Sequence, residues 1–293
     1  MCSPFLKLFA AAAAVAASIS CSSSPRDPLA EKNYIEHPKQ IKIPASTTAL
    51  RVCADPNNMP FSNSKREGLE NRLAELVARD LGVTVRYTWW PQRRGFFRST
   101  LNAGRCDVVM GVPSNLPMVL PTRPYYRSQY VLVTRADRKL TIKSLDDPIL
   151  RQLRIGVQVV GDGANTPPVE ALARRGITRN LVGFTVFGDY ARPNPPARIM
   201  DAVAARDVDV AVVWGPLAGY FLTREGTPLK ITPIPKDATS SATPLAFAIS
   251  IGVRKGDRTR QALIDGILAR RQDEIEQLLN QYGVPRDSAL ASS

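Results

Sequence analysis

The side chains that most often perform catalysis are sparse in this sequence. His37 is the only histidine among the 293 residues, and it lies in a segment that mixes charge with proline. A nucleophile–base pair or a zinc site needs partners that one stray histidine cannot supply. Asp146 and Asp147 are adjacent and precede Pro148, a pattern typical of a loop or a helix cap. We therefore expect a non-enzymatic protein with no cofactor and no metal of its own.

Two other segments carry side chains suited to binding. Trp89, Trp90, Arg93 and Arg94 combine indoles with guanidinium groups, which are enriched at interfaces and can hold an anionic group. This segment has three interpretations: a ligand wall, a surface for docking a partner, or core packing of Trp89 beside solvated arginines. A glycine-rich loop, residues 161–166, precedes a helix and could bind an anion through backbone N–H groups. Asp162 opposes an anion there, and loop geometry accounts for the glycines equally well.

These residues must be positioned by alternating strands and helices. Apolar patterns predict strands at residues 50–54, 83–89 and 107–112, with helices at 69–81 and 96–103 between them. The same order recurs as strands at 154–160, 182–187 and 208–214, with helices at 168–175 and 197–206. Short connections in this order favour parallel strands joined by right-handed crossovers. The sequence predicts an α/β protein with two lobes.

The end of the chain predicts a hinge. Residues 245–253 form another strand-like run, followed by a turn and cap at Gly256 and Asp257 and one long amphipathic helix that ends at Gly283. A connection at residues 131–140 leads out to the second lobe, and this terminal segment leads back. Lobe 1 is predicted at residues 49–137 plus 242–293, and lobe 2 at residues 138–241. Two crossings would make a hinge that closes around a ligand.

Ligands of open parallel sheets bind beyond the carboxyl ends of the strands. Applied here, that rule gives a cleft lined by Asp55, Asn57, Asn58, Phe61, Trp89, Trp90, Arg93, Arg94, Pro113, Asn115, Asp162, Asn165, Thr166 and Trp214. Tyr125 and Tyr126 are expected to fill the lobe interior near the hinge.

The N-terminus has the pattern of an export signal. Lys7 precedes an apolar run at residues 8–17, and small residues lead to Cys21. The run is shorter than the roughly 20 residues that a bilayer requires, so residues 1–20 are predicted to be a cleaved signal peptide. Cys21 would be lipidated if the stretch is a lipobox, although Ser18 stands where such boxes usually have leucine. Residues 21–48 are predicted to be a flexible arm, and the mature protein to be periplasmic, with membrane contact only through a lipid anchor.

Export also bears on the cysteines and on the charge. In an oxidising compartment Cys53 and Cys106 could form a disulfide, and the alternative is two buried thiols.

The formal net charge is +13. Since an exported protein is not expected to meet nucleic acid, this excess indicates either docking onto an acidic periplasmic protein or a surface suited to solubility.

Several motifs resemble a known family. Residues 50–55 (LRVCAD) with Pro60 and Phe61, residues 102–111 (NAGRCDVVMG) and residues 124–126 (PYY) are similar to the family-3 amino-acid solute-binding proteins, from about Leu50 to Pro285. Residues 54–63 (ADPNNMPFSN), 87–96 (YTWWPQRRGF), 156–158 (GVQ) and 165–168 (NTPP) resemble the MxaJ/XoxJ group within that family. This resemblance implies a type II-like periplasmic binding fold, with two α/β lobes joined by a two-segment hinge.

The sequence departs from the family at two places. Amino-acid binders carry an arginine after the third strand for the ligand carboxylate and an acid after the last strand of the second lobe for the ammonium group. Residues 112–119 contain no arginine, and residues 212–216 contain no acid. A zwitterion without those partners would be desolvated at a cost of several kcal/mol per ion. We therefore predict that free α-amino acids do not bind tightly.

The resemblance implies an accessory role. Proteins of the MxaJ/XoxJ group are associated with quinoprotein methanol dehydrogenases, so the expected partners are a pyrroloquinoline quinone (PQQ)-dependent alcohol dehydrogenase and its cytochrome c. The cleft would then accept a hydrophobic segment or a cofactor-like group, and a peptide or small-molecule ligand is a further possibility. One alternative is a solute-binding protein that delivers a small non-amino-acid ligand to an ABC transporter. Another is a small-molecule lyase on the same fold.

Overall fold

The computed structural model describes residues 48–160, 165–186, 195–222, 226, 228–235 and 243–286. The chain divides into Met1–Lys42 and Ile43–Ser293, and all the helices and strands of the described ranges lie in the second unit. The predicted signal peptide, nearly all of the predicted arm, and Cys21 lie outside the described residues. None of the helices in the described ranges is both long enough and apolar enough for a transmembrane span.

The first half of the fold follows the predicted order. It comprises β1 (Ala49–Ala54), the short β2 (Asn57–Asn58) and β3 (Ser62–Asn63), α1 (Leu69–Asp80), β4 (Thr84–Trp89), α2 (Phe96–Ser99) and β5 (Val108–Pro113). β1 pairs in parallel with both β4 and β5. Leu69, Leu73 and Val77 bury one face of α1 against this sheet, because residues at this spacing share a helix face.

The predicted helix at residues 96–103 is only one turn long. Thr100 leaves the helical region at φ −121° and ψ −85°, and its hydroxyl donates a hydrogen bond to the carbonyl of Phe96 at 2.6 Å. The backbone therefore turns into the loop that leads to Cys106. Cys106 forms a disulfide with Cys53, with an S–S distance of 2.02 Å and Cα atoms 5.5 Å apart. The bridge lies in a small core with Phe96, Leu101, Val109, Val112 and Val119.

The second half repeats the α/β pattern. Its elements are β8 (Ile155–Val159), α3 (Pro167–Arg174), β9 (Leu181–Thr185), η4 (Pro195–Ala197), α4 (Arg198–Ala204), β10 (Val210–Trp214), α5 (Gly215–Leu222) and β11 (Leu229–Pro233). β8 pairs in parallel with β9 and β10. The helix α5 was not among the helices predicted from the sequence. Asp147 caps η3 (Pro148–Arg151) by accepting from the N–H of Ile149, which confirms a capping role for this carboxylate.

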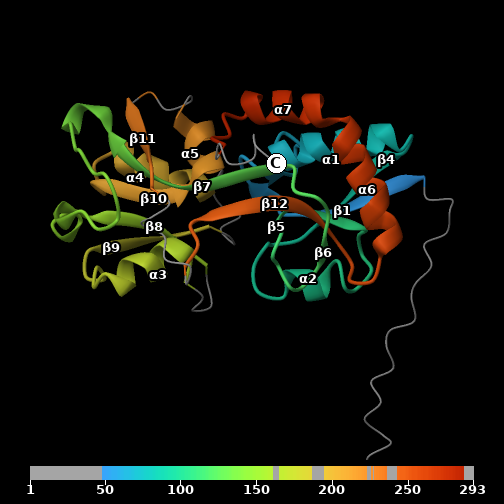
Figure 1. Ribbon diagram of the computed structural model, residues 1–293, viewed down its shortest axis with the longest axis horizontal. Helices are drawn as coiled ribbons and strands as arrows, with labels where there is room; N and C mark the ends of the chain where they lie inside the picture. The colour runs from blue at the N-terminus through green and yellow to red at the C-terminus, as the bar shows by residue number, and fades with distance from the viewer. Residues whose placement is uncertain are drawn as a thin grey trace, which may run out of the picture. The chain divides into compact units, whose positions relative to one another are not determined.

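Two long strands connect the halves (Figure 1). They are β7 (Tyr126–Arg135) and β12 (Ala246–Val253), and the short β6 (Leu120–Pro121) pairs beside β12. β7 pairs with β12 up to Gln129 and with β10 from Tyr130 onward, so one strand serves both parts of the sheet. The connection predicted at residues 131–140 consists of the last part of β7, which is strand up to Arg135, followed by η2 (Ala136–Arg138). The lobe bounds given above stay a prediction.

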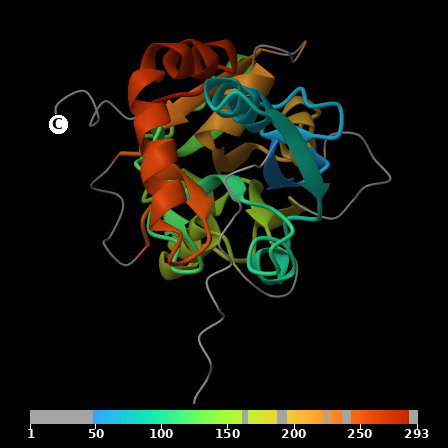
Figure 2. The same ribbon diagram turned by 90° about the vertical axis from the view of Figure 1, so that its right-hand side faces the viewer.

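The C-terminal segment forms a further link. The predicted long helix is broken into α6 (Arg258–Arg270), capped by Asp257, and α7 (Gln272–Gln281). At the break, Arg271 has φ −105° and pairs with Asp80 of α1 at 2.7 Å. α1 and α7 lie on one side of the first half and α2 on the other, and α6 runs along the edge between them (Figures 1 and 2).

The tail after α7 then packs on α5 of the second half. Gly219 approaches the backbone so closely that a Cβ atom would lie 1.9 Å from the carbonyl oxygen of Gly283. The hydroxyl of Ser128 donates to the carbonyl of Pro285 at 2.6 Å, and the rings of Tyr220 and Tyr282 stack.

Candidate functional site

The predicted loop after β1 forms a hydrogen-bonded unit with the loop after β4. The carboxylate of Asp55, 1% exposed, accepts the N–H groups of Asn57 and Gln92, both at 2.8 Å. The side-chain amide of Asn58 donates to the side-chain oxygen of Gln92 at 3.3 Å. Asn58 Oδ1 is buried without a hydrogen-bond partner in the described parts of the chain. Three predicted residues are therefore brought together, with Asp55 joining two strand-end loops.

Phe61 positions the start of α1. Its carbonyl accepts the N–H of Glu70 at 2.8 Å, and a Cβ on Gly68 would lie 2.1 Å from the same oxygen. Gly68 is therefore required by the close approach of two backbone segments. The Phe61 side chain is partly buried.

Glu70, which the sequence analysis missed, lies beneath this loop. Its carboxyl group faces Gly111 on β5, where Oε1 lies 1.8 Å from the position that a Cβ would take. Burial raises the pKa of Glu70 to about 8, and the negative charge of Asp55 adds to the rise. Acids are common in the first turn of a helix, so Glu70 has the appearance of a routine charge in the sequence. The sequence signal that could have revealed this contact is the pair of glycines involved. Gly68 precedes Glu70 by two residues, and Gly111 lies in the buried strand that Glu70 faces.

Aromatic side chains gather where β7, β10 and β12 meet. The ring of Trp214, at the end of β10, lies 5.3 Å from that of Tyr130 and 6.0 Å from that of Phe247. A hydrogen bond links Trp214 to the Tyr126 hydroxyl, although burial still leaves the pKa of Tyr126 far above its usual value. Tyr125 and Tyr126 are buried in the core, as predicted. Trp214 thus sits at a strand end, half-buried within a group of rings.

The neighbouring indoles Trp89 and Trp90 do not form one wall. Trp89 packs on the core beneath α1 and stacks on Tyr87 with centroids 4.4 Å apart. Trp90 packs on the disulfide cluster, and the guanidinium of Arg105 lies 5.1 Å from its ring centre. Successive side chains of an extended chain point to opposite faces, which separates the two. Arg93 and Arg94 are exposed in the turn that follows.

The remaining predicted residues are spread over several environments. Pro113 is paired with Ile249 at the end of β5, and Asn115 is exposed in the next loop. Thr166 is buried and its hydroxyl donates to the carbonyl of Gln158 at 2.6 Å, while Asn165 is exposed. Asp162 and most of the glycine-rich loop lie outside the described residues.

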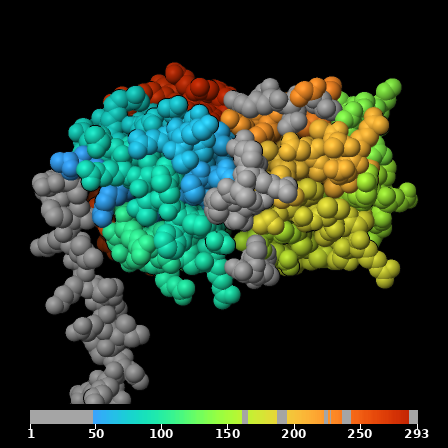
Figure 3. Space-filling view, turned by 180° about the vertical axis from the view of Figure 1, so that it is seen from behind, coloured from blue at the N-terminus to red at the C-terminus, as the bar shows by residue number. Residues whose placement is uncertain are grey.

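Met59 crosses from one half of the fold to the other. It belongs to the loop after β1, yet its side chain is 5% exposed and packs with Val131, Ile199 and Met200. β2 lies against η4 of the second half in the same region. Figure 3 shows residues near position 60, in blue, and the second half, in yellow and orange, on the same side of the molecule. The sequence offered no signal for this contact, because a methionine in a turn-rich loop has no periodicity.

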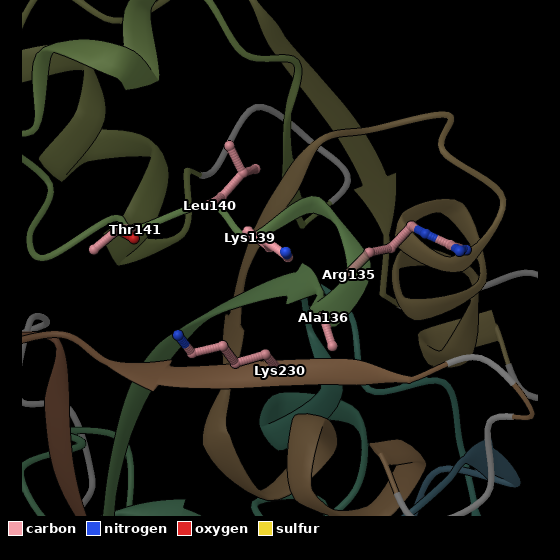
Figure 4. A pocket seen from close by; sticks show the side chains of 6 residues that line it. All are labelled: Arg135, Ala136, Lys139, Leu140, Thr141 and Lys230. Atoms are coloured by element: carbon pink, nitrogen blue, oxygen red, sulfur yellow. The ribbon is translucent and has the colours of Figure 1, made fainter.

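A separate small pocket of about 310 Å³ lies at the far end of β7 (Figure 4). It is lined by Arg135, Ala136, Lys139, Leu140, Thr141 and Lys230, none of them a predicted site residue. Arg135 is paired with Asp137 at 2.7 Å. The pocket contains none of the residues that follow β1, β4, β5 or β10, and the candidate site is placed at Asp55, Glu70 and Trp214 because of their chemistry. In the ranges that the structure describes, no group of three or more His, Cys, Asp or Glu side chains is placed to hold a metal.

The fold and these strand-end residues define an extracellular solute-binding protein. Residues 50–285 match the model of the bacterial extracellular solute-binding proteins, family 3, and the chain belongs to that family. It is 36% identical over 248 residues to Protein MoxJ of Methylorubrum extorquens, covering 80% of this chain and 81% of that protein.

Two solved structures extend the comparison. The periplasmic binding protein XoxJ of Methylobacterium extorquens AM1 is 34% identical, with a TM-score of 0.66 and coverage of 81% of this chain and 99% of that one. MxaJ of Methlophaga aminisulfidivorans MPT is 27% identical, with a TM-score of 0.69 and coverage of 81% and 100%. The chain is therefore of the MxaJ/XoxJ type, and the type II-like fold predicted from the motifs is confirmed.

Proposed function

We propose that this protein is a non-enzymatic periplasmic accessory protein of a PQQ-dependent methanol or alcohol dehydrogenase system, which binds the dehydrogenase or helps its maturation. The observation that carries the proposal is the similarity to MoxJ, XoxJ and MxaJ over four fifths of the chain. The cytochrome c of such a system is a second candidate partner.

The side chains at the strand ends support a binding fold that no longer holds amino acids. The loop after β5 presents Ser114 and Asn115 where an amino-acid binder carries its arginine, and the Ser114 hydroxyl is engaged with that of Ser250 at 2.7 Å. The end of β10 presents Trp214 rather than an acid. With a pKa near 8, Glu70 is largely protonated at neutral pH. These groups favour an apolar or hydrogen-bonding ligand, such as a hydrophobic segment, over a zwitterion.

Affinity capture of the tagged mature protein from its own periplasm tests the role. We expect recovery of a quinoprotein dehydrogenase, weakened when the salt concentration is raised, because the net charge of the full chain is +13. The purified dehydrogenase should then bind the purified protein in calorimetry. Recovery of a permease without a quinoprotein would instead assign the protein to solute transport.

The amino-acid prediction has its own test. Thermal unfolding with each common amino acid should show no shift of the midpoint, because a ligand stabilises the folded state only in proportion to its binding. A micromolar dissociation constant for any of them would show that the missing arginine and acid do not matter.

A further inference from the structure

One stretch of the chain is basic without interruption. Between Asp80 and Asp107 the sequence contains five arginines and no acidic residue or lysine. These arginines are Arg86, Arg93, Arg94, Arg98 and Arg105, and all five are exposed. Together with Trp90 they are called the α2 face below.

Arginines elsewhere in the described chain are commonly paired. Asp107 lies 2.7 Å from Arg51 and 2.6 Å from Arg260, and Asp209 is shared by Arg138 and Arg154. In the same described ranges, none of the five arginines of the α2 face has an ion pair. No carboxylate in the described part of the chain therefore neutralises their charge.

The five arginines come from adjoining segments. Arg86 lies on the same face of β4 as Thr88, and the Thr88 hydroxyl donates to the carbonyl of Arg105 at 3.1 Å. The N–H of Phe96 donates to the carbonyl of Arg93, which folds the turn before α2. Arg98 belongs to α2 itself, on the side of the first half away from α1 and α7 (Figures 1 and 2).

Covalent and aromatic contacts fix this face. Arg105 directly precedes Cys106, and the disulfide ties Cys106 to Cys53 on β1. The guanidinium group of Arg105 lies over the half-buried ring of Trp90. Phe96 is 2% exposed and anchors α2 to the disulfide cluster. A backbone held in this way carries the guanidinium groups at defined positions, which suits a partner whose carboxylates are also held at fixed positions, because less order is lost on binding. A fluid lipid surface would not need such an arrangement.

We propose that the α2 face docks an acidic surface of a folded partner protein. The proposal rests on the function proposed above and assigns this face to the dehydrogenase. Trp90 with Arg105 supplies the apolar anchor, and the other arginines supply charge complementarity and speed association.

Two variants with the same loss of charge test the assignment. The first replaces all five arginines of the α2 face by glutamine. The control removes five exposed cations elsewhere, as Lys143→Gln, Arg174→Gln, Arg179→Gln, Lys255→Gln and Arg258→Gln. Circular dichroism and thermal unfolding establish that both variants are folded. A third variant has lysine at the five positions of the α2 face, which keeps the positive charge but removes the bidentate guanidinium group.

Binding to the purified dehydrogenase is measured at low salt and at about 0.5 M salt, where charges are screened within a few ångströms. We expect the α2-face variant to bind at least about tenfold more weakly with a reduced salt dependence, and the control to bind within about twofold of wild type. The lysine variant should keep most of the association rate and dissociate faster.

Equal weakening of both glutamine variants, or of neither, would overturn the α2 face and leave the accessory role intact. A wild-type protein that does not bind the dehydrogenase would overturn the accessory role and this assignment with it. Vesicles containing phosphatidylglycerol provide the remaining comparison. If the α2-face substitutions abolish vesicle binding and leave dehydrogenase binding unchanged, the face belongs to a membrane and the proposal is wrong.

Discussion

The carboxyl group of Glu70 fills the space in which a side chain on Gly111 would begin, with Oε1 1.8 Å from an ideal Cβ position. Gly111 also has φ +67°, a conformation that side chains other than glycine rarely adopt. The two residues connect the start of α1 to the second half of β5, close enough to Asp55 for its charge to act on Glu70. This arrangement places an acid at the strand ends without an arginine partner among the described residues.

Gly111→Ala should therefore lower the free energy of unfolding for two reasons. Backbone strain costs about 1–2 kcal/mol, and displacing the Glu70 carboxyl from its position adds to that. Denaturant unfolding should show a lower midpoint with an unchanged slope. Gly82→Ala is the matched control, because Gly82 has the same φ of +67° and nothing within 4 Å of its Cβ position. A loss no larger in Gly111→Ala than in Gly82→Ala would refute the steric role of Glu70.

Glu70→Gln should change the pH dependence of stability. Because the folded pKa is raised to about 8 from an ordinary 4.5, the folded protein holds a proton that the unfolded chain releases in this window. The free energy of unfolding should then fall as pH rises from about 4.5 to 8. The negative charge of Asp55 adds to the raised pKa of Glu70, and the charge of Glu70 in turn raises the pKa values of its neighbours Tyr87, Tyr125 and Tyr126.

Glutamine at position 70 does not titrate, so it removes the contribution of Glu70 to the pH dependence of the free energy of unfolding. The Glu70→Gln variant should therefore become more stable relative to wild type as pH rises toward 8. Urea titrations at several pH values measure it, with Glu75→Gln on the same helix as the control. A wild-type slope that persists in Glu70→Gln would show that another group is responsible.

Removing the disulfide should destabilise the first half of the fold. Cys53 and Cys106 are 53 residues apart, and the loop-closure entropy for this separation predicts a loss of about 4 kcal/mol in the free energy of unfolding. The double variant Cys53→Ala/Cys106→Ala should show this loss under oxidising conditions. Since Cys106 is 0% exposed, a mild reductant should reduce the native wild-type protein only slowly. Equal stability of the two proteins would indicate that the bridge contributes nothing.

Met59→Ala should loosen the contact between the two halves. The side chain is buried against Ile199 and Met200, and truncating a buried methionine typically costs about 2–5 kcal/mol. Hydrogen exchange should speed up in η4 and α4, although the substitution lies in the loop after β1. Met118→Ala, at a side chain that is 48% exposed, should leave stability within about 0.5 kcal/mol of wild type. Exchange that rises only around residue 59 would contradict a role in joining the halves.

Much of the fold could be predicted from local sequence. The apolar spacing of Leu69, Leu73 and Val77 defines α1, and Asp257 marks the start of α6 as a cap. The motifs around Asp55 and Gly111 indicated the family, and the missing arginine in residues 112–119 is visible in the sequence itself. Such features depend on neighbours along the chain, so one sequence is enough to see them.

Only the tertiary structure decided the surroundings of particular side chains. The carboxyl of Glu70 meets Gly111, Met59 enters the core of the other half, and Trp89 and Trp90 separate onto opposite faces. The predicted terminal helix breaks at Arg271, beside Asp80 of α1. Each outcome depends on residues far away in the sequence, and burial, pKa and steric fit are set by those distant contacts rather than by local pattern.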